Sequence, residues 1–209
     1  MFLCPDEIQA SGGVKQIYRH VDVLNSIGIP AFVLHQNEGF RCDWFKNDTK
    51  ILYNKKIFSV IYKTKPGEVK EFIKSIIQNF FQGLQLIAKY KKEEAEILET
   101  DILVIPEIWT YCIEEIQSEN KMIIYNQNCF YTFSNYGIQS NLNYSYLQKS
   151  VAAIITVSQN SLDYLNFAFP QKPVFRVVHS INHLNFYYKK DKKKQVAFMS
   201  RKLMEDIEQ

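Results

Sequence analysis

FLCPDEIQASGGVKQIYRHVDVLNSIGIPAFVLH, residues 2–35, is the stretch that decides the fold. Its first residues, Phe2–Cys4, are apolar and predict a short strand. After Gly12–Gly13, apolar residues recur three and four positions apart, which predicts an amphipathic helix. Gly28 and the proline two residues later end that helix, and Ala31–His35 predicts a buried strand. A strand, a glycine turn, a helix and a second strand form a βαβ unit with a right-handed crossover.

The rest of the sequence alternates between short apolar runs and amphipathic segments. Further strands are predicted at 57–62, 102–105, 122–125, 152–157 and 174–178. Helices are predicted at 66–84, 110–118 and 158–166. This alternation predicts the α/β class, with a Rossmann-like open sheet that is mostly parallel and has helices on both faces.

Composition and charge indicate a globular protein of the cytoplasm. The net charge of +3 is too small to indicate a nucleic-acid partner. The four cysteines lie far apart without metal-ligand spacing, so reduced thiols are expected. The amino terminus lacks a signal-peptide pattern, and no apolar run reaches the ~20 residues of a membrane span. Peripheral contact with the inner membrane face stays open for the lysine-flanked helix predicted at 66–84, although packing of that helix against the core is favoured.

Polar groups at predicted strand ends are candidates for ligand binding. Gly12–Gly13 lies where a helix begins, so its backbone amides and the positive end of the helix dipole suit an anion. A tight turn that needs glycine for its geometry alone is the alternative. Glu107, Asn126–Asn128 and Ser158 follow three predicted strands, and ligands of open α/β sheets bind at the carboxyl ends of strands. These side chains suit a polyhydroxyl ligand, whereas solvation of the loops is the alternative.

Several common catalytic signatures are absent from the sequence. It contains no GxGxxG, GxSxG, P-loop or DxD, which disfavours a nicotinamide-dependent dehydrogenase, a serine hydrolase, an NTPase and a metal-dependent transferase. Among the histidines, His20 lies beside the apolar stripe of the first helix and is expected to pack, whereas His35 ends a strand and is expected to be more accessible. His179 and His183 are four residues apart but lack the glutamate of HExxH, so zinc is not indicated.

Several segments occur in the order that is typical of one enzyme family. The opening Gly12–Val14, followed by Tyr18, His20 and Gly28, resembles that of family 4-type glycosyltransferases of the GT-B fold. More specific segments are Ile105–Trp109, Tyr125–Asn128 with Tyr131–Phe133, Ala153–Ser158, Gly39–Arg41 with Asp43–Phe45, the stretch Phe169–Phe186, and Phe198–Lys202. Across nearly the whole chain, these segments resemble a bacterial rhamnosyltransferase-like subgroup that builds surface polysaccharides.

The resemblance implies retaining transfer of a sugar from a nucleotide-diphosphate sugar to a glycan or lipid-linked acceptor, without a cofactor or an obligatory metal. The departing diphosphate would be stabilised electrostatically by fixed backbone amides and a guanidinium group. The residues that the resemblance assigns to the donor are Gly12, Gly13, Ser158 and Arg201. Those that it assigns to the acceptor and sugar region, as catalytic candidates, are Glu107, Gln127 and Asn128.

The sequence also departs from the family pattern. Many relatives carry a histidine where Gln127 and Asn128 stand, and an amide is no base at neutral pH. Lys202 directly follows Arg201, whereas the family lysine comes several residues later. We expect an acceptor-side domain over residues 1–188 and, over residues 189–209, a linker and the first strand of a donor-binding domain that this truncated chain lacks. A separate chain would supply that domain. The alternative is a non-catalytic remnant or a glycan- or nucleotide-binding module that needs a partner chain.

Overall fold

The computed structural model describes residues 1–64, 94–116, 119–134, 145–179, 187–191 and 193–194. The chain divides into two compact units, Met1–His179 and Ser180–Gln209. Every helix and strand of the described residues lies in the first unit. The predicted helix at 66–84, the connector at 180–186 and the strand at 195–199 lie outside the described residues. The domain boundary after residue 188 stays a prediction.

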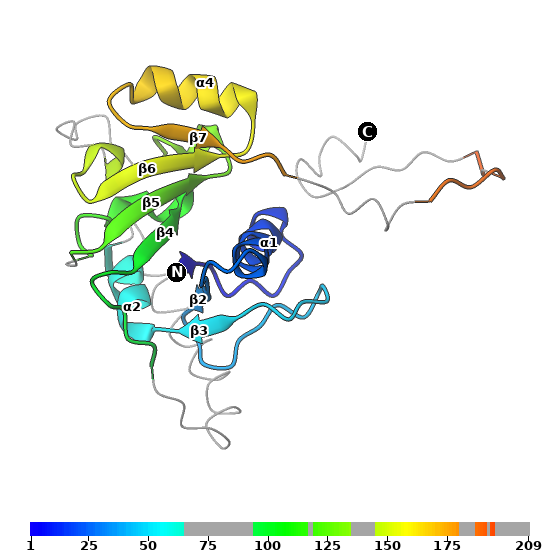
Figure 1. The fold of residues 1–209 in the computed structure, drawn as a ribbon, viewed down its shortest axis with the longest axis horizontal. Coiled ribbons are helices and arrows are strands. Elements are labelled where there is room, and N and C mark those ends of the chain that lie inside the picture. The colour runs from blue at the N-terminus through cyan, green and yellow to red at the C-terminus, as the bar shows by residue number, and fades with distance from the viewer. Residues whose placement is uncertain (65–93, 117–118, 135–144, 180–186, 192, 195–209) are drawn as a thin grey trace, which may run out of the picture. The chain divides into compact units, whose positions relative to one another are not determined.

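Seven parallel strands form one sheet (Figure 1). They are β1 (Phe2–Leu3), β2 (Val33–His35), β3 (Ile51–Tyr53), β4 (Ile102–Pro106), β5 (Lys121–Asn126), β6 (Val151–Thr156) and β7 (Val174–Arg176). Their order in space is β3-β2-β1-β4-β5-β6-β7, and every neighbouring pair is parallel. The prediction of an α/β, Rossmann-like open sheet is confirmed.

Helices cover both faces of the sheet. The α-helices are α1 (Gly12–Ser26), α2 (Lys55–Thr64) and α4 (Gln159–Ala168), and the 3-10 helices are η1 (Glu107–Cys112), η2 (Cys129–Tyr131) and η3 (Ser145–Leu147). Neighbouring residues of a strand point to opposite faces. Accordingly, Val104 of β4 packs in the core cluster of α1, while Leu103 and Ile105 pack with α2, η1 and α4. No helix of the described residues is long and apolar enough to cross a membrane.

The structure confirms the βαβ unit that the opening of the sequence predicts. The buried residues of α1 are Val14, Ile17, Tyr18 and Val21, which lie three and four positions apart on one face. The helix ends before Gly28, whose φ of 83° lies in the left-handed region that favours glycine. Both strands of the unit pair in parallel, with Phe2 opposite Val33.

The prediction of a strand at Ile57–Tyr62 is wrong, because these residues form part of α2. Ile57, Phe58 and Ile61 are buried on one side of that helix, and a short apolar run does not by itself separate a strand from a buried helix. The third strand, β3, lies earlier, at Ile51–Tyr53, where no strand was predicted. The helix predicted at 110–118 begins three residues sooner and is the 3-10 helix η1.

Candidate functional site

The strand order creates a topological switch point between β1 and β4. From β1 the chain proceeds through β2 to β3 at one edge, and it then returns to β4 and continues through β5 and β6 to β7 at the other. In open parallel sheets, ligands bind outside the carboxyl ends of the strands at such a point. The residues that follow β1, β4 and β5 are therefore the first candidates for a site.

The amino end of α1 follows β1 and carries the predicted Gly12–Gly13. Ser11 is the N-cap residue but makes no side-chain capping hydrogen bond, and no acidic residue lies in the first turn. Gln127, just after β5, donates a hydrogen bond from its Nε2 to the carbonyl of Gly13 over 3.3 Å. A Cβ on Gly13 would lie 3.2 Å from Oε1 of Gln127, whereas one on Gly12 would meet nothing within 4 Å. A side chain at position 13 would therefore press on the end of the Gln127 side chain.

Glu107 begins η1 directly after β4, and its residue is only 5% exposed. Burial raises the pKa of Glu107, and hydrogen bonds from the backbone amides of Gln127, Glu107 itself and Asn128 partly offset that effect. The carboxyl group of Glu107 therefore faces the segment that follows β5. The structure thus brings together Gly13, Glu107, Gln127 and the backbone of Asn128, which the sequence places far apart.

Two predicted side chains have local structural roles. The Oδ1 of Asn128 accepts a hydrogen bond from Phe130 N over 3.1 Å and caps η2. The Oγ of Ser158 accepts one from Ser161 N over 3.0 Å and caps α4. Ser158 follows β6, which lies two strands from β4 in the sheet. Arg201, the predicted phosphate-binding residue, lies outside the described residues.

A cluster that sequence reasoning missed lies between α1, β5 and the segment after β7. The hydroxyl of Tyr125 is 2.8 Å from Nε2 of His179. The ring centroid of His20 lies 5.0 Å from that of Tyr125 and 5.6 Å from that of His179. We call these three residues the His20 cluster. Tyr125 and His179 are 54 positions apart, so no spacing in the sequence joins them.

The titration of the His20 cluster is shifted by its surroundings. Burial, followed by the neighbouring His179, lowers the pKa of His20 from 6.5 to about 4. Burial, followed by the charge of Arg19, also lowers the pKa of His179. Burial and then the charge of Glu107 raise the pKa of Tyr125, so the cluster lies within electrostatic reach of the predicted site. Two neutral imidazoles and a phenol near a carboxyl group are suited to exchanging protons or to binding hydroxyl groups.

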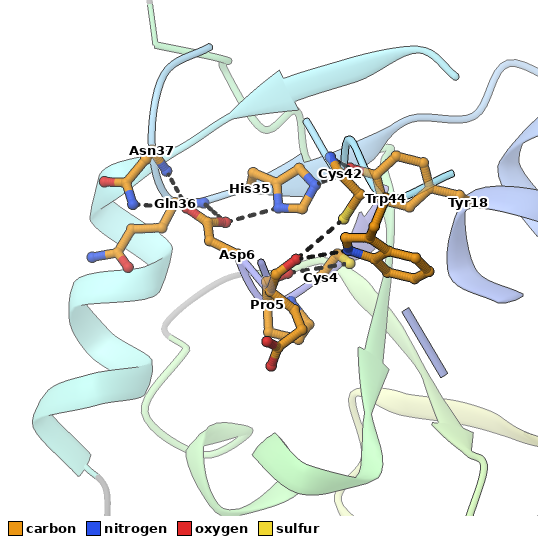
Figure 2. A network of polar contacts seen from close by, with 10 residues as sticks. Cys4, Pro5, Asp6, Tyr18, His35, Gln36, Asn37, Cys42 and Trp44 are labelled. Carbon is orange, nitrogen blue, oxygen red and sulfur yellow. Dashed lines mark hydrogen bonds and ion pairs between the residues drawn. The ribbon is translucent and has the colours of Figure 1, made fainter. Parts of the chain in front are cut away.

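A second buried group lies at the ends of β1 and β2 (Figure 2). The Nδ1 of His35 is 2.8 Å from Oδ1 of Asp6, and its Nε2 is 2.7 Å from the hydroxyl of Tyr18. We call these residues the Asp6–His35–Tyr18 network. The expectation that His35 is accessible is wrong, because its exposed fraction is 0%. Tyr18 of α1 and Phe40 enclose His35, and the ring centroids of Phe40 and His35 are 4.8 Å apart.

In the part of the chain that the structure describes, no metal centre adds residues to this site, and a cavity beside α2 is lined by other residues. Among the described residues, no group of three or more His, Cys, Asp or Glu side chains is arranged to hold a metal ion. All four cysteines are free and buried. A cavity of about 540 Å³ lies beside α2 and is lined by Asn54, Lys56, Ile57, Val60, Lys63, Ile97, Leu103, Glu115, Ile116 and Asn120. None of the predicted site residues lines it.

No protein-family model, curated protein or solved structure matches the chain. The site is therefore defined by its own geometry. It consists of the amino end of α1 at Gly13, the carboxyl group of Glu107 and the side chain of Gln127. Tyr125 of the His20 cluster lies within electrostatic reach of Glu107.

Proposed function

We propose that this chain is the acceptor-side domain of a GT-B glycosyltransferase, which transfers a sugar from a nucleotide-diphosphate sugar to a glycan or lipid-linked acceptor in surface polysaccharide synthesis. The observation that carries the proposal is the meeting of Gly13, Glu107 and Gln127 at the switch point of the parallel sheet. These residues belong to segments whose order resembles that of the family, and they come from three different strand ends.

The amino end of α1 suits the negatively charged part of such a donor. The first helical amides have no partner within the helix, and Ser11 does not cap them with its side chain. A diphosphate placed there would meet the positive end of the helix dipole. We therefore assign the amides of Gly12 and Gly13 to the donor diphosphate, with Arg201 as a further phosphate ligand from the resemblance.

Glu107 and Gln127 suit the sugar and the acceptor. A carboxyl group held by backbone amides keeps one orientation. Glu107 can therefore accept a hydrogen bond from a hydroxyl group, or donate one to it when protonated, without changing its orientation. Gln127 has no basic group, and its side chain contacts Gly13. We therefore propose that Gln127 shapes the junction between the donor and acceptor regions rather than moving a proton. This role is compatible with retaining transfer.

The proposal is tested by transfer of radiolabelled sugar from a panel of nucleotide sugars. The chain is assayed alone and together with the product of the reading frame immediately downstream, since the proposal places the donor pocket in a second domain. We expect Glu107→Gln to reduce transfer about 100-fold. The matched control is Glu119→Gln, which makes the same change at an exposed position.

Absence of transfer in every mixture would contradict the glycosyltransferase proposal. Binding of a nucleotide sugar without transfer would support the alternative of a non-catalytic binding module. The side chain of Asn128, one of the catalytic candidates, already caps η2, and this observation favours that alternative. For the chain alone we expect weak nucleotide binding, and a low-micromolar affinity in calorimetry would contradict the assignment of half of the diphosphate site to another domain.

A further inference from the structure

The loop between β1 and α1 is held at Asp6, whose carboxylate has four hydrogen-bond donors around it. Oδ1 accepts from Nδ1 of His35 over 2.8 Å and from Gln36 N over 3.2 Å. Oδ2 accepts from Asn37 N over 3.0 Å and from Asn37 Nδ2 over 2.8 Å. The donors all belong to the end of β2 and the residues that follow it (Figure 2). Asp6 thus fastens one loop of the switch point to the neighbouring strand.

The chemistry of the three side chains sets the direction of both hydrogen bonds for the neutral form of His35. A carboxylate only accepts, so Nδ1 of His35 carries a proton, and in the neutral imidazole Nε2 then accepts from Tyr18. Burial raises the pKa of Tyr18, which keeps its phenol proton available for this bond. The hydroxyl oxygen also accepts from Cys42 N over 3.1 Å. Because Tyr18 and His35 are fully buried, they cannot touch a ligand.

We infer that the Asp6–His35–Tyr18 network is a positioning device that fixes the β1–α1 loop, and with it the amino end of α1, before a ligand arrives. The inference rests on the proposed function for the identity of the ligand, a nucleoside diphosphate. Asp6 lies before Gly12–Gly13 and Tyr18 lies after it in the sequence, so the network holds both sides of the segment that carries the anion-binding amides. The carbonyl of Glu7 adds an anchor, because it accepts from Nε1 of Trp44 over 3.1 Å.

Two substitutions each remove hydrogen bonds from the network and keep the rest of the side chain in place. In Asp6→Asn, one carboxylate oxygen becomes an NH2 group, so two of the four donors face another donor. Tyr18→Phe keeps the buried ring and removes only the hydroxyl, which leaves Nε2 of His35 and the amide of Cys42 without this partner. The control is Glu7→Gln, the same chemical change one residue further along the loop, where Oε1 accepts an exposed hydrogen bond from Gln9 N.

Amide hydrogen exchange measures how readily the β1–α1 loop opens. The 15N chemical shifts of the imidazole measure which nitrogen of His35 carries a proton. We expect exchange of the hydrogen-bonded amides of Glu7 and Lys15, which lie on either side of Gly12–Gly13, to accelerate about tenfold in Asp6→Asn and Tyr18→Phe, and to stay within about twofold in Glu7→Gln. Protected amides of β5 report that each variant is folded. The 15N shifts of His35 should indicate a proton on Nδ1 in the native chain, and Tyr18→Phe should change the Nε2 signal.

Titration with uridine, guanosine and thymidine diphosphates, followed by NMR, completes the test. We expect Asp6→Asn to weaken binding about tenfold and Glu7→Gln to leave it unchanged. Unchanged loop exchange in both network variants would overturn the inference, and so would faster exchange with unchanged affinity. If the native chain binds none of the three probes, the proposed function fails, and the exchange rates and the His35 shifts alone decide whether the network holds the loop.

Discussion

Acidification should destabilise this chain through His20. Its ring is half-buried against Tyr125 and His179, and burial followed by the charge of His179 lowers the pKa of His20 from 6.5 to about 4. The folded state therefore resists protonation at a pH where the unfolded chain accepts a proton. The stabilising contribution is fully present above pH 6.5 and is lost as the pH falls towards the folded pKa. Replacing His20 by glutamine removes this titration and keeps a polar side chain.

The magnitude follows from the two pKa values. One pKa unit corresponds to about 1.4 kcal/mol, so a pKa lowered from 6.5 to about 4 amounts to about 3 kcal/mol between pH 7.5 and pH 4. Solvent screening at a half-buried ring reduces this value to about 2 kcal/mol. Glu107 acts in the opposite direction, because a raised carboxyl pKa gives stability that is lost as the pH rises. Comparing the native chain with His20→Gln cancels the contribution of Glu107.

Urea unfolding at several pH values between 7.5 and 4 measures the prediction. The free energy of unfolding of the native chain should fall by about 2 kcal/mol more than that of His20→Gln over this range. A parallel NMR titration of the His20 ring should give a pKa well below 6.5, and His179→Gln should raise it, since His179 contributes to the shift. A stability difference that stays within about 0.5 kcal/mol at every pH, or titration of His20 near 6.5, would refute the reasoning.

Two stability predictions concern other parts of the fold. Gly28→Ala should lower the free energy of unfolding by about 1 kcal/mol, because its φ of 83° is costly for a side chain; Gly12→Ala, which meets open space, is the control in urea unfolding. Tyr146→Phe should cost about 1–2 kcal/mol, because its hydroxyl accepts from Nδ2 of the buried Asn126 over 2.8 Å. Thermal unfolding of the exposed Tyr187→Phe should show no comparable change, and equal effects would contradict the role of the buried hydrogen bond.

The sheet was predictable because its strands carry local signals. The central strands β4 and β5 are short apolar runs bounded by polar residues, as expected for strands covered on both faces. The same reasoning gave a wrong prediction for the segment that forms α2, because Ile57, Phe58 and Ile61 also form a compact apolar run. Whether such a run forms a helix or a strand depends on the tertiary contacts of its buried side, which here are with the face of the sheet that η1 also covers.

The candidate site was predictable only where position along a strand fixes position in space. Glu107 and Gln127 each follow a strand, and parallel strands bring their carboxyl ends to one edge, so their proximity follows from the fold class. The same rule brings Asp6, after β1, towards His35, at the end of the neighbouring β2, but it does not predict that the two side chains form a hydrogen bond. Tyr125 lies on β5 and His179 follows β7, and these strands are not neighbours, so no rule of the sheet predicts their contact. Their hydrogen bonds depend on side-chain directions that are set only when α1 packs on the sheet.

One helix connects the His20 cluster and the Asp6–His35–Tyr18 network. Tyr18 and His20 are two positions apart on α1, and because successive residues of an α-helix are about 100° apart, these side chains point to opposite flanks. Tyr18 reaches the end of β2 through His35, whereas His20 reaches Tyr125 on β5. A movement of α1 that changes the contact of Tyr18 with His35 must therefore also change the contact of His20 with Tyr125. Attachment on both flanks explains how α1, which has no side-chain cap at Ser11, keeps its amino end directed at the switch point. It also predicts that a substitution that breaks the contacts on either flank should change the position of Gly13 relative to Gln127.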